Sequence, residues 1–214
     1  GFHTVVTFRL SKHLLSYTKR VLDIMICWKC KESVQSMVCV GCSTIQPPPP
    51  KPDFFEVLSL KRSYFVTPED ISAAHRIKIR LVHPDRFVKK SAVERRMSLQ
   101  WTAFLNEAKR VLSNSNIRAR YIATGEVKPM EVGGPKLSGE FLEFIFDVQM
   151  DLGSGSEEEQ SKIVEEVRGM RQQRLDTMNA DFLAFEQNKE HSLDGVEVIL
   201  AELQYLENIL ETQL

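Results

Sequence analysis

Four cysteines are the residues of this chain whose spacing most clearly predicts a chemistry. Cys27 and Cys30 form one Cys-x-x-Cys pair, and eight residues later Cys39 and Cys42 form a second. Each short turn aims two thiolates at one ion and the two pairs complete a tetrahedral shell, so the spacing predicts one zinc ion. Because four thiolates leave no coordination position open, this zinc should stabilise a fold and not catalyse a reaction.

The same cysteines admit other interpretations, namely two disulfides, a redox-active dithiol or a rubredoxin-like iron site. Disulfides would suit an oxidising compartment, and the gap between the two pairs is shorter than the usual zinc spacing. We expect a tight hairpin across residues 32–38 to close this gap, with Gly41 supplying the bent backbone of the second turn. The predicted zinc knuckle covers residues 25–46.

Charge and proline content divide the rest of the chain into modules. The 214 residues are 43% hydrophobic and carry 28 Lys/Arg against 29 Asp/Glu, which indicates a globular protein. Residues 53–125 carry 14 Lys/Arg against 7 Asp/Glu, whereas residues 126–214 carry 7 against 20. This asymmetry predicts two modules with different partners. The proline-rich segment 47–52 should form an extended linker between the knuckle and the first module.

The sequence predicts a soluble protein without a membrane partner, because it contains no run of about 18 uncharged apolar residues. Residues 1–24 are an N-terminal extension with four Lys/Arg and a single acidic residue, Asp23. This basic composition is typical of an organellar presequence. The segment could equally be translated from upstream of a start at Met25, so the fold is predicted from the residues that follow it.

A helical hairpin is predicted within residues 53–125. Thr67 before a proline is an N-terminal capping signal, and the helix that it starts should end near Val82 because Pro84 cannot extend it. Ser91 with Glu94 forms a capping box at the start of a second helix, which apolar spacing extends to about residue 112. Two such helices joined by a short loop should pack antiparallel. Short helices are expected to flank the hairpin on both sides, at about 54–58 and 116–124.

The hairpin should present the loop of His83, Pro84 and Asp85 at its exposed tip. On the preceding helix, Ile77 and Lys78 fall with other residues on a mostly apolar face. Arg76 and Arg80 lie four residues apart on a second face, which should be positive and exposed. Taken alone, such charges are ordinarily a solvated helix face and the tripeptide is ordinarily a turn.

The order of these parts resembles the J domain of co-chaperones that activate seventy-kilodalton heat-shock ATPases. Four short segments narrow the resemblance to the HscB type, the J protein of iron–sulfur cluster assembly, some members of which carry an N-terminal pair of Cys-x-x-Cys motifs. These segments are DFF at 53–55, HPDRF at 83–87, LNEA at 105–108 and RARY at 118–121. The resemblance implies that Arg76, Lys78 and Arg80 meet an acidic surface of the ATPase chaperone, and that His83, Pro84 and Asp85 engage it where hydrolysis is triggered.

Residues 138–214 predict a second module, an acidic bundle of three antiparallel helices. The first of these helices, from about Glu140, carries too many large apolar side chains for one buried stripe. The resemblance implies that this bundle binds the scaffold protein on which iron–sulfur clusters are built. The positions that match the family's binding patch are Leu142, Glu143, Phe146 and Tyr205, although Glu143 stands where the family has an apolar residue. Packing of these side chains against the J-like module is the alternative.

The predicted fold is therefore all-α, a J domain at 53–125 plus a three-helix bundle, preceded by the zinc knuckle. The predicted function is a co-chaperone, without catalysis of its own, that stimulates the ATPase chaperone and delivers the cluster scaffold to it. A general J protein whose bundle serves as a spacer or a dimerisation element is the alternative. Nucleic-acid binding is disfavoured, because the knuckle lacks a dense basic stripe with interleaved aromatic residues. The expected compartment is the bacterial cytoplasm, with the mitochondrial matrix as the alternative.

Overall fold

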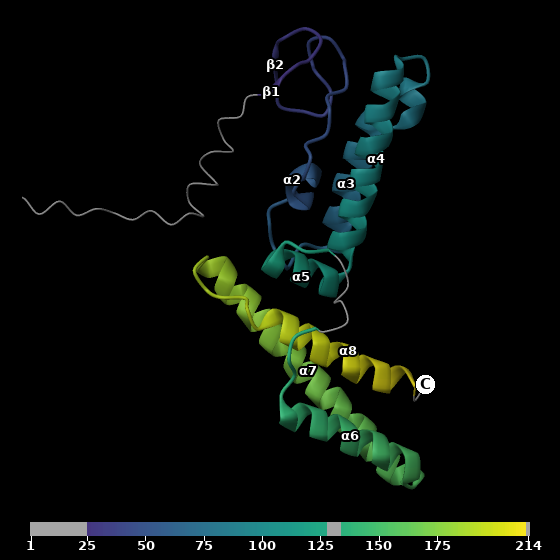
Figure 1. Cartoon of the computed structure of the whole chain (residues 1–214), viewed down its shortest axis with the longest axis vertical. Coiled ribbons are helices and arrows are strands. Elements are labelled where there is room, and N and C mark those ends of the chain that lie inside the picture. The colour runs from purple at the N-terminus through teal and green to yellow at the C-terminus, as the bar shows by residue number, and fades with distance from the viewer. Residues whose placement is uncertain (1–24, 128–133, 213–214) are drawn as a thin grey trace, which may run out of the picture. The chain divides into compact units, whose positions relative to one another are not determined.

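The structure, a computed structural model, describes residues 25–127 and 134–212 (Figure 1). The N-terminal extension predicted at residues 1–24 lies outside the described residues. The described part is mostly helical, which confirms the predicted all-α class with a small knuckle before it. Its elements are β1 (Met25–Ile26), β2 (Ser33–Val34), α2 (Phe54–Leu58), α3 (Pro68–Val82), the 3₁₀ helix η1 (Pro84–Phe87), α4 (Ala92–Ser113), α5 (Ser115–Thr124), α6 (Gly139–Ser154), α7 (Glu157–Gln187) and α8 (Val196–Glu211).

The chain divides into two compact units, and each combines segments that are distant in the sequence. Among the described residues, the first unit combines 25–53 with His75–Asn106, so it holds the knuckle and the outer part of the α3–α4 hairpin. The second combines Phe54–Ala74 with the described residues from Glu107 onward, so it holds the base of the hairpin and helices α5 to α8.

The knuckle is built from two small hairpins, each of which encloses one cysteine pair. β1 pairs antiparallel with β2 around the first pair, with Met25 opposite Val34. A bridge between Val38 and Ile45 encloses the second pair. The prediction of one hairpin across residues 32–38 was wrong, because the strands pair around the cysteines and not between them.

The backbone bend of each cysteine turn falls on the residue after the pair. Lys31 and Ser43 have φ angles of 65° and 55°, in the left-handed region. Gly41 is outside that region, so its predicted role in bending the backbone was wrong. A Cβ atom at Gly41 would lie 2.1 Å from Glu32 Oε2, so its small size instead lets that flexible carboxylate approach.

Helices α3 and α4 begin at the predicted capping residues. The Asp70 amide donates to Thr67 Oγ1 at 3.1 Å, and Ser91 and Glu94 bond each other's amides at 3.3 and 3.1 Å. These bonds satisfy amides that have no partner inside a helix.

The expected apolar face of α3 was partly wrong, because the side chain of Ile77 is 62% exposed. A helix turns by about 100° per residue, so Lys78 follows the line of the buried Ile71 and Val82, while Ile77 lies off to one side of it. Lys78 is accordingly half-buried.

In the second unit, the segment before α3 is fixed to α7 by stacking and hydrogen bonds. The ring of Tyr64 stacks on Phe182 with centroids 4.2 Å apart. Glu186 accepts hydrogen bonds from the Ser63 hydroxyl at 2.6 Å and the Tyr64 amide at 3.1 Å. The buried Arg118 of α5 donates to the Tyr64 carbonyl at 2.9 Å. These contacts join the base of the hairpin to the bundle.

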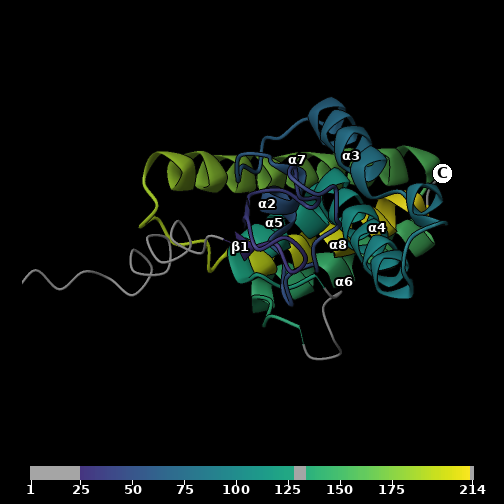
Figure 2. The same cartoon turned by 90° about the horizontal axis from the view of Figure 1, so that it is seen from above.

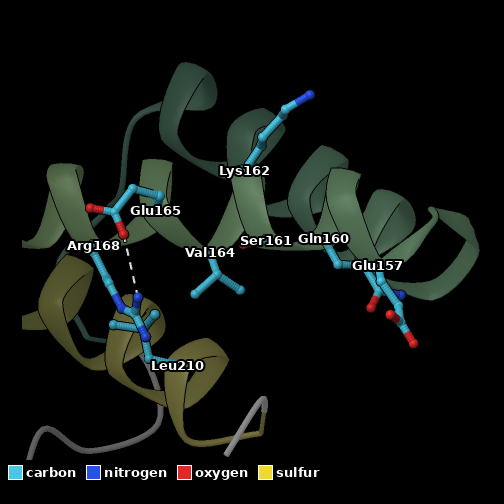
Figure 3. A pocket seen from close by; sticks show the side chains of 8 residues that line it. All are labelled: Glu157, Gln160, Ser161, Lys162, Val164, Glu165, Arg168 and Leu210. Atoms are coloured by element: carbon cyan, nitrogen blue, oxygen red, sulfur yellow. Dashed lines mark hydrogen bonds and ion pairs between the residues drawn. The ribbon is translucent and has the colours of Figure 1, made fainter.

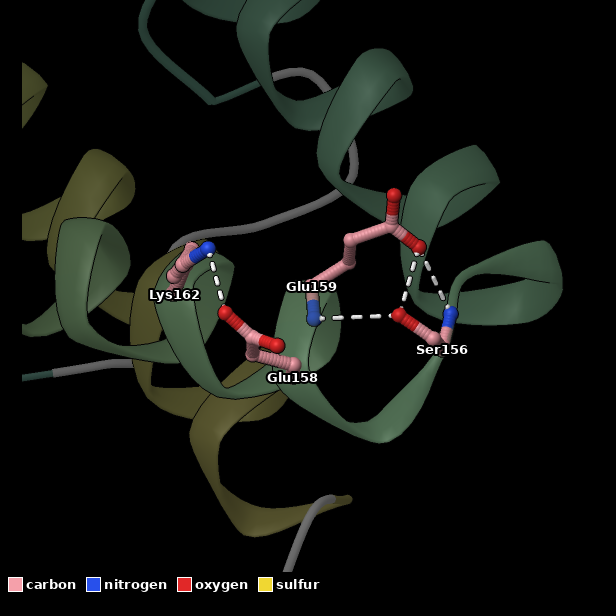
Figure 4. A network of polar contacts seen from close by, with 4 residues as sticks. All are labelled: Ser156, Glu158, Glu159 and Lys162. Atoms are coloured by element: carbon pink, nitrogen blue, oxygen red, sulfur yellow. Dashed lines mark hydrogen bonds and ion pairs between the residues drawn. The ribbon is translucent and has the colours of Figure 1, made fainter.

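Helices α6, α7 and α8 form the predicted bundle, and the long helix α7 crosses the view in Figure 2. α7 has 31 residues. α7 begins at a capping box in which Ser156 Oγ accepts the Glu159 amide while Glu159 accepts the Ser156 amide (Figure 4). The bundle core is formed by Phe141, Ile145, Val148, Val167, Leu206 and Ile209. Among the described residues, no helix is both long and apolar enough to span a membrane.

Replacing Phe182 with Ala should lower the free energy of unfolding by about 3–5 kcal/mol, because it leaves a cavity against Tyr64. The matched control is Leu183→Ala on the same helix, whose side chain is 53% exposed and should cost under about 1 kcal/mol. Chemical denaturation measures both. Equal losses for the two variants would contradict the packing described above.

Candidate functional site

The four cysteines come together in the structure, as their spacing predicts. Their Sγ atoms all lie within 4.8 Å of one another. Cys27 and Cys42 are separated by 3.6 Å between sulfurs, and so are Cys30 and Cys39. Zinc–sulfur bonds of about 2.3 Å in a tetrahedron place the sulfurs roughly 3.8 Å apart. All four cysteines are free of disulfides, so the cluster fits a single metal ion.

The cysteine thiols influence one another's protonation. Burial acts to raise the pKa of Cys27, but hydrogen bonds from the backbone of Cys30 and Lys29 lower it to about 6. The Glu32 backbone acts to lower the pKa of Cys30, but burial and the neighbouring cysteine sulfurs raise it to about 12. Four thiolates this close would repel one another, so a bound cation would be needed to keep all four cysteines deprotonated.

Two polar side chains that the sequence analysis did not single out lie against the sulfurs. The Gln46 Nε2 amide donates to Cys27 Sγ at 3.4 Å, and Thr44 Oγ1 lies 3.3 Å from Cys42 Sγ. Both residues are buried. The available sequence signal is that Thr44 and Gln46 are polar and lie two and four residues after the last cysteine. Side chains so near a metal ligand commonly donate hydrogen bonds to it.

The loop after α3 brings the side chains of His83 and Asp85 together at an exposed corner. Nδ1 of His83 accepts the Asp85 amide at 3.3 Å and lies 3.5 Å from Asp85 Oδ2. Pro84 begins the short helix η1 directly after His83. Both the imidazole and the carboxylate are open to a partner, because the side chain of His83 is 50% exposed and that of Asp85 is 87% exposed.

The corner is supported by three residues that the sequence analysis did not assign to it. The hydroxyl of the buried Ser98 donates to the carbonyl of Val82 at 2.5 Å, and Arg86 donates to the carbonyl of Arg80 at 2.7 Å. These carbonyls end α3 and have no partner inside the helix. The buried Phe87 anchors the loop from below.

The cations on α3 are not equivalent. Arg76 and Arg80 are exposed, whereas Lys78 is half-buried. The loop and the start of α4 add further exposed cations that the sequence analysis did not name. They are Arg86, Lys89, Lys90, Arg95 and Arg96. The corner therefore lies in a positive field that would attract an acidic surface.

The second candidate surface lies on α6 and α8. Leu142 is 47% exposed and Phe146 is 62% exposed, with Glu143 exposed beside them. Tyr205 of α8 is also exposed, and its ring meets the buried Phe141 edge-on with centroids 6.3 Å apart. These side chains are thus available to a partner.

Met150, also exposed, extends this surface by one further helical turn beyond Phe146. Met150 was not predicted as part of this surface, although the spacing of four residues from Leu142 to Phe146 to Met150 is the signal that marks one helix face. A flexible methionine suits a contact surface that must fit a partner's irregular shape.

A pocket of about 650 Å³ lies between the start of α7 and the end of α8 (Figure 3). Its lining mixes acidic and basic side chains, and Arg168 is paired with Glu165 at 3.3 Å. Such an exposed, internally paired lining offers no convergent group for chemistry. The pocket is therefore a weaker candidate for a functional site than the two surfaces described above.

No family model matches the chain. It is 27% identical over 192 residues to the mouse iron–sulfur cluster co-chaperone protein HscB, covering 86% of this chain and 80% of that protein. It is 29% identical over 170 residues to the Arabidopsis thaliana HscB homologue, covering 76% of this chain and 64% of that protein. A Bordetella avium HscB homologue is 39% identical over 70 residues, 33% of this chain and 42% of that protein.

Two solved structures have a similar fold. The crystal structure of human co-chaperone protein HscB matches with a TM-score of 0.68 and 24% identity, covering 88% of this chain and 96% of that one. The chaperone HscB from Vibrio cholerae matches with a TM-score of 0.57 and 18% identity, covering 75% and 94%. The resemblance to HscB seen in the sequence is confirmed.

The purified chain should contain about one metal ion, and Cys39→Ser should lose it because a three-thiolate site binds the ion more weakly. Lower pH should also release the metal, since protons compete for the thiolates. Elemental analysis after dialysis measures both effects. The control Gln35→Ala changes an exposed residue of the same knuckle and should keep the metal. Full metal content in Cys39→Ser would contradict the four-cysteine site.

Proposed function

We propose that this chain, a homologue of the iron–sulfur cluster co-chaperones named HscB, stimulates the ATPase of a seventy-kilodalton heat-shock chaperone and delivers the cluster scaffold protein to it. The observation that carries the proposal is the exposed His83 and Asp85 corner beside the exposed Arg80, in a chain with this homology. The homologues are named for iron–sulfur clusters, which favours this function over that of a general J protein.

The corner of His83, Pro84 and Asp85 is the proposed chaperone-binding site, together with the cations of α3. Arg76 and Arg80 offer guanidinium groups that can pair bidentately with carboxylates. Lys78, which is half-buried, contributes less exposed charge. Asp85 offers a carboxylate to an arginine of the partner. Binding that is stronger to one state of the ATPase shifts its equilibrium, so the chain needs no catalytic group of its own.

The exposed face of Leu142, Glu143 and Phe146, with Tyr205 beside it, is the proposed scaffold-binding site. Its apolar side chains would be buried by the partner, which supplies most of the binding energy. Glu143 and the net negative charge of the C-terminal module favour a partner with a basic rim. Because one chain carries both sites, a bound scaffold is held at high effective concentration near the chaperone.

The metal of the knuckle is proposed to be zinc. Four thiolates at near-tetrahedral spacing suit Zn²⁺, which has no redox chemistry and is common in sites of this type. Cys27, Cys30, Cys39 and Cys42 would hold it, and the ion would stabilise the knuckle without an open position for a substrate. Neither nucleic acid nor a membrane is proposed as a partner.

The compartment is proposed from the extent of the sequence matches. The matches to the mouse and Arabidopsis thaliana relatives extend over 192 and 170 residues, whereas the match to the Bordetella avium homologue extends over 70. This difference favours the mitochondrial matrix, the alternative at the level of the sequence, over the bacterial cytoplasm.

The chain and the scaffold together should accelerate ATP hydrolysis by the chaperone, and His83→Gln should reduce this stimulation at least about tenfold, a loss of about 1.4 kcal/mol in coupling. Steady-state phosphate release measures it. The matched control His191→Gln alters a histidine in the loop before α8 and should stimulate like the parent chain. Undiminished stimulation by His83→Gln would overturn the proposed function.

Phe146→Ala should weaken scaffold binding about tenfold or more, because an exposed aromatic anchor of this kind contributes about 1–3 kcal/mol when buried by a partner. Leu142→Ala should act in the same direction. Isothermal titration calorimetry with the isolated scaffold measures the affinity. The control Leu183→Ala removes a similarly exposed leucine from α7 and should bind normally. Unchanged affinity in both α6 variants would favour a bundle that serves only as a spacer.

A further inference from the structure

Gln46 is the last residue of the knuckle, and all its polar groups are used. It is 2% exposed. Its side-chain amide donates to Cys27 Sγ at 3.4 Å and to the Thr44 carbonyl at 2.7 Å, and its Oε1 accepts the Trp28 amide at 3.3 Å. Its own amide donates to the Met37 carbonyl at 2.8 Å. The position of the Gln46 side chain therefore depends directly on Cys27, a predicted metal ligand.

The remaining polar atom of Gln46 connects the knuckle to the helical hairpin. Its carbonyl accepts the indole N–H of Trp101 at 2.7 Å, although the two residues are 55 positions apart. Trp101 lies on α4 and is buried. The contact lies wholly within the first compact unit. Gln46 directly precedes the proline linker. The knuckle is therefore joined to the hairpin by a buried hydrogen bond as well as by the covalent linker.

One turn of α4 separates Trp101 from the corner of the hairpin. Ser98, three residues earlier and fully buried, donates to the carbonyl of Val82 at 2.5 Å. Val82 is the residue directly before His83. Cys27 is therefore linked to α4 through Gln46 and Trp101, and α4 is linked to the residue before His83 through Ser98.

We propose that metal occupancy of the four-cysteine site controls the order of the His83, Pro84 and Asp85 corner through Gln46 and Trp101. The inference rests on the proposed metal site. A knuckle of about 22 residues is too small to fold without its metal, so loss of the ion frees Gln46 from Cys27. The Trp101 indole then loses its buried acceptor, and α4 loses an anchor one turn from Ser98, whose hydroxyl donates to the carbonyl of Val82. Gln46 is a positioning residue in this arrangement.

The coupling between the metal site and the hairpin is reciprocal. A contact that lets the metal stabilise the hairpin also lets the hairpin stabilise the bound metal, by the same factor. Trp101→Phe removes the indole N–H while keeping an aromatic ring in the core. It should therefore weaken zinc binding about tenfold, even though Trp101 touches no cysteine. The control Trp28→Phe removes an indole bond to Ile45 inside the knuckle, at 2.8 Å, and leaves the contact with α4 intact.

The test uses the full chain, first titrated to one zinc ion, with hydrogen exchange read by mass spectrometry before and after a chelator. Zinc removal should raise exchange about tenfold or more in peptides that cover residues 79–90 and 96–104, beyond the knuckle itself. In Trp101→Phe, these peptides should exchange faster with zinc bound and should respond little to the chelator. In Trp28→Phe, they should still respond.

Exchange that rises only within residues 25–46, with residues 79–90 unchanged, would overturn the coupling while leaving the metal site intact. Parental zinc affinity in Trp101→Phe would do the same. Failure of the chain to bind zinc at all would overturn both the coupling and the metal site, and the initial titration identifies that case.

If Trp101→Phe does not fold, Gln46→Met tests the same link, because it keeps the backbone carbonyl that accepts from Trp101 but removes the side-chain bonds to Cys27, Thr44 and Trp28. Its residues 79–90 should then also lose most of their response to zinc.

Discussion

The end of α3 is the constraint on which the exposed corner depends. Pro84 has no amide hydrogen and cannot continue the helix, so the last carbonyls of α3 need donors from elsewhere. Ser98 and Arg86 supply them, and the buried Phe87 fixes the loop that follows. Because other residues satisfy these carbonyls, the side chains of His83 and Asp85 are not needed as donors to the helix end. They contact each other and remain open to a partner.

The two proposed binding surfaces differ in chemistry, which suits two different partners. The corner is surrounded by arginines and lysines, whereas the α6 face combines apolar side chains with exposed carboxylates in an acidic module. A partner attracted to one surface is therefore repelled by the field of the other. The near-zero net charge of the whole chain conceals this division. In the second unit, stacking of Tyr64 on Phe182 fixes the base of the hairpin to the bundle that carries the α6 face.

Local signals in the sequence were sufficient for most of the fold. Capping boxes, prolines and helical spacing predict the starts of α3 and α4 and the end of α3, because each depends on residues within one or two turns. The cysteine spacing likewise predicts the metal cluster. The hydrogen bond between Gln46 and Trp101 could not be predicted, because it depends on how the knuckle packs against a helix 55 residues away in the sequence. The exposure of Ile77 and the bends at Lys31 and Ser43 also depend on packing that spacing alone does not specify.

The central claim is that one chain joins the ATPase chaperone and the cluster scaffold through separate surfaces. Sedimentation velocity of the three proteins together, with ATP present, tests it most directly. The account predicts a ternary complex with one copy of each protein, which disappears when the chain is omitted. Mutually exclusive binding, in which added scaffold displaces the chaperone from the chain, would contradict it.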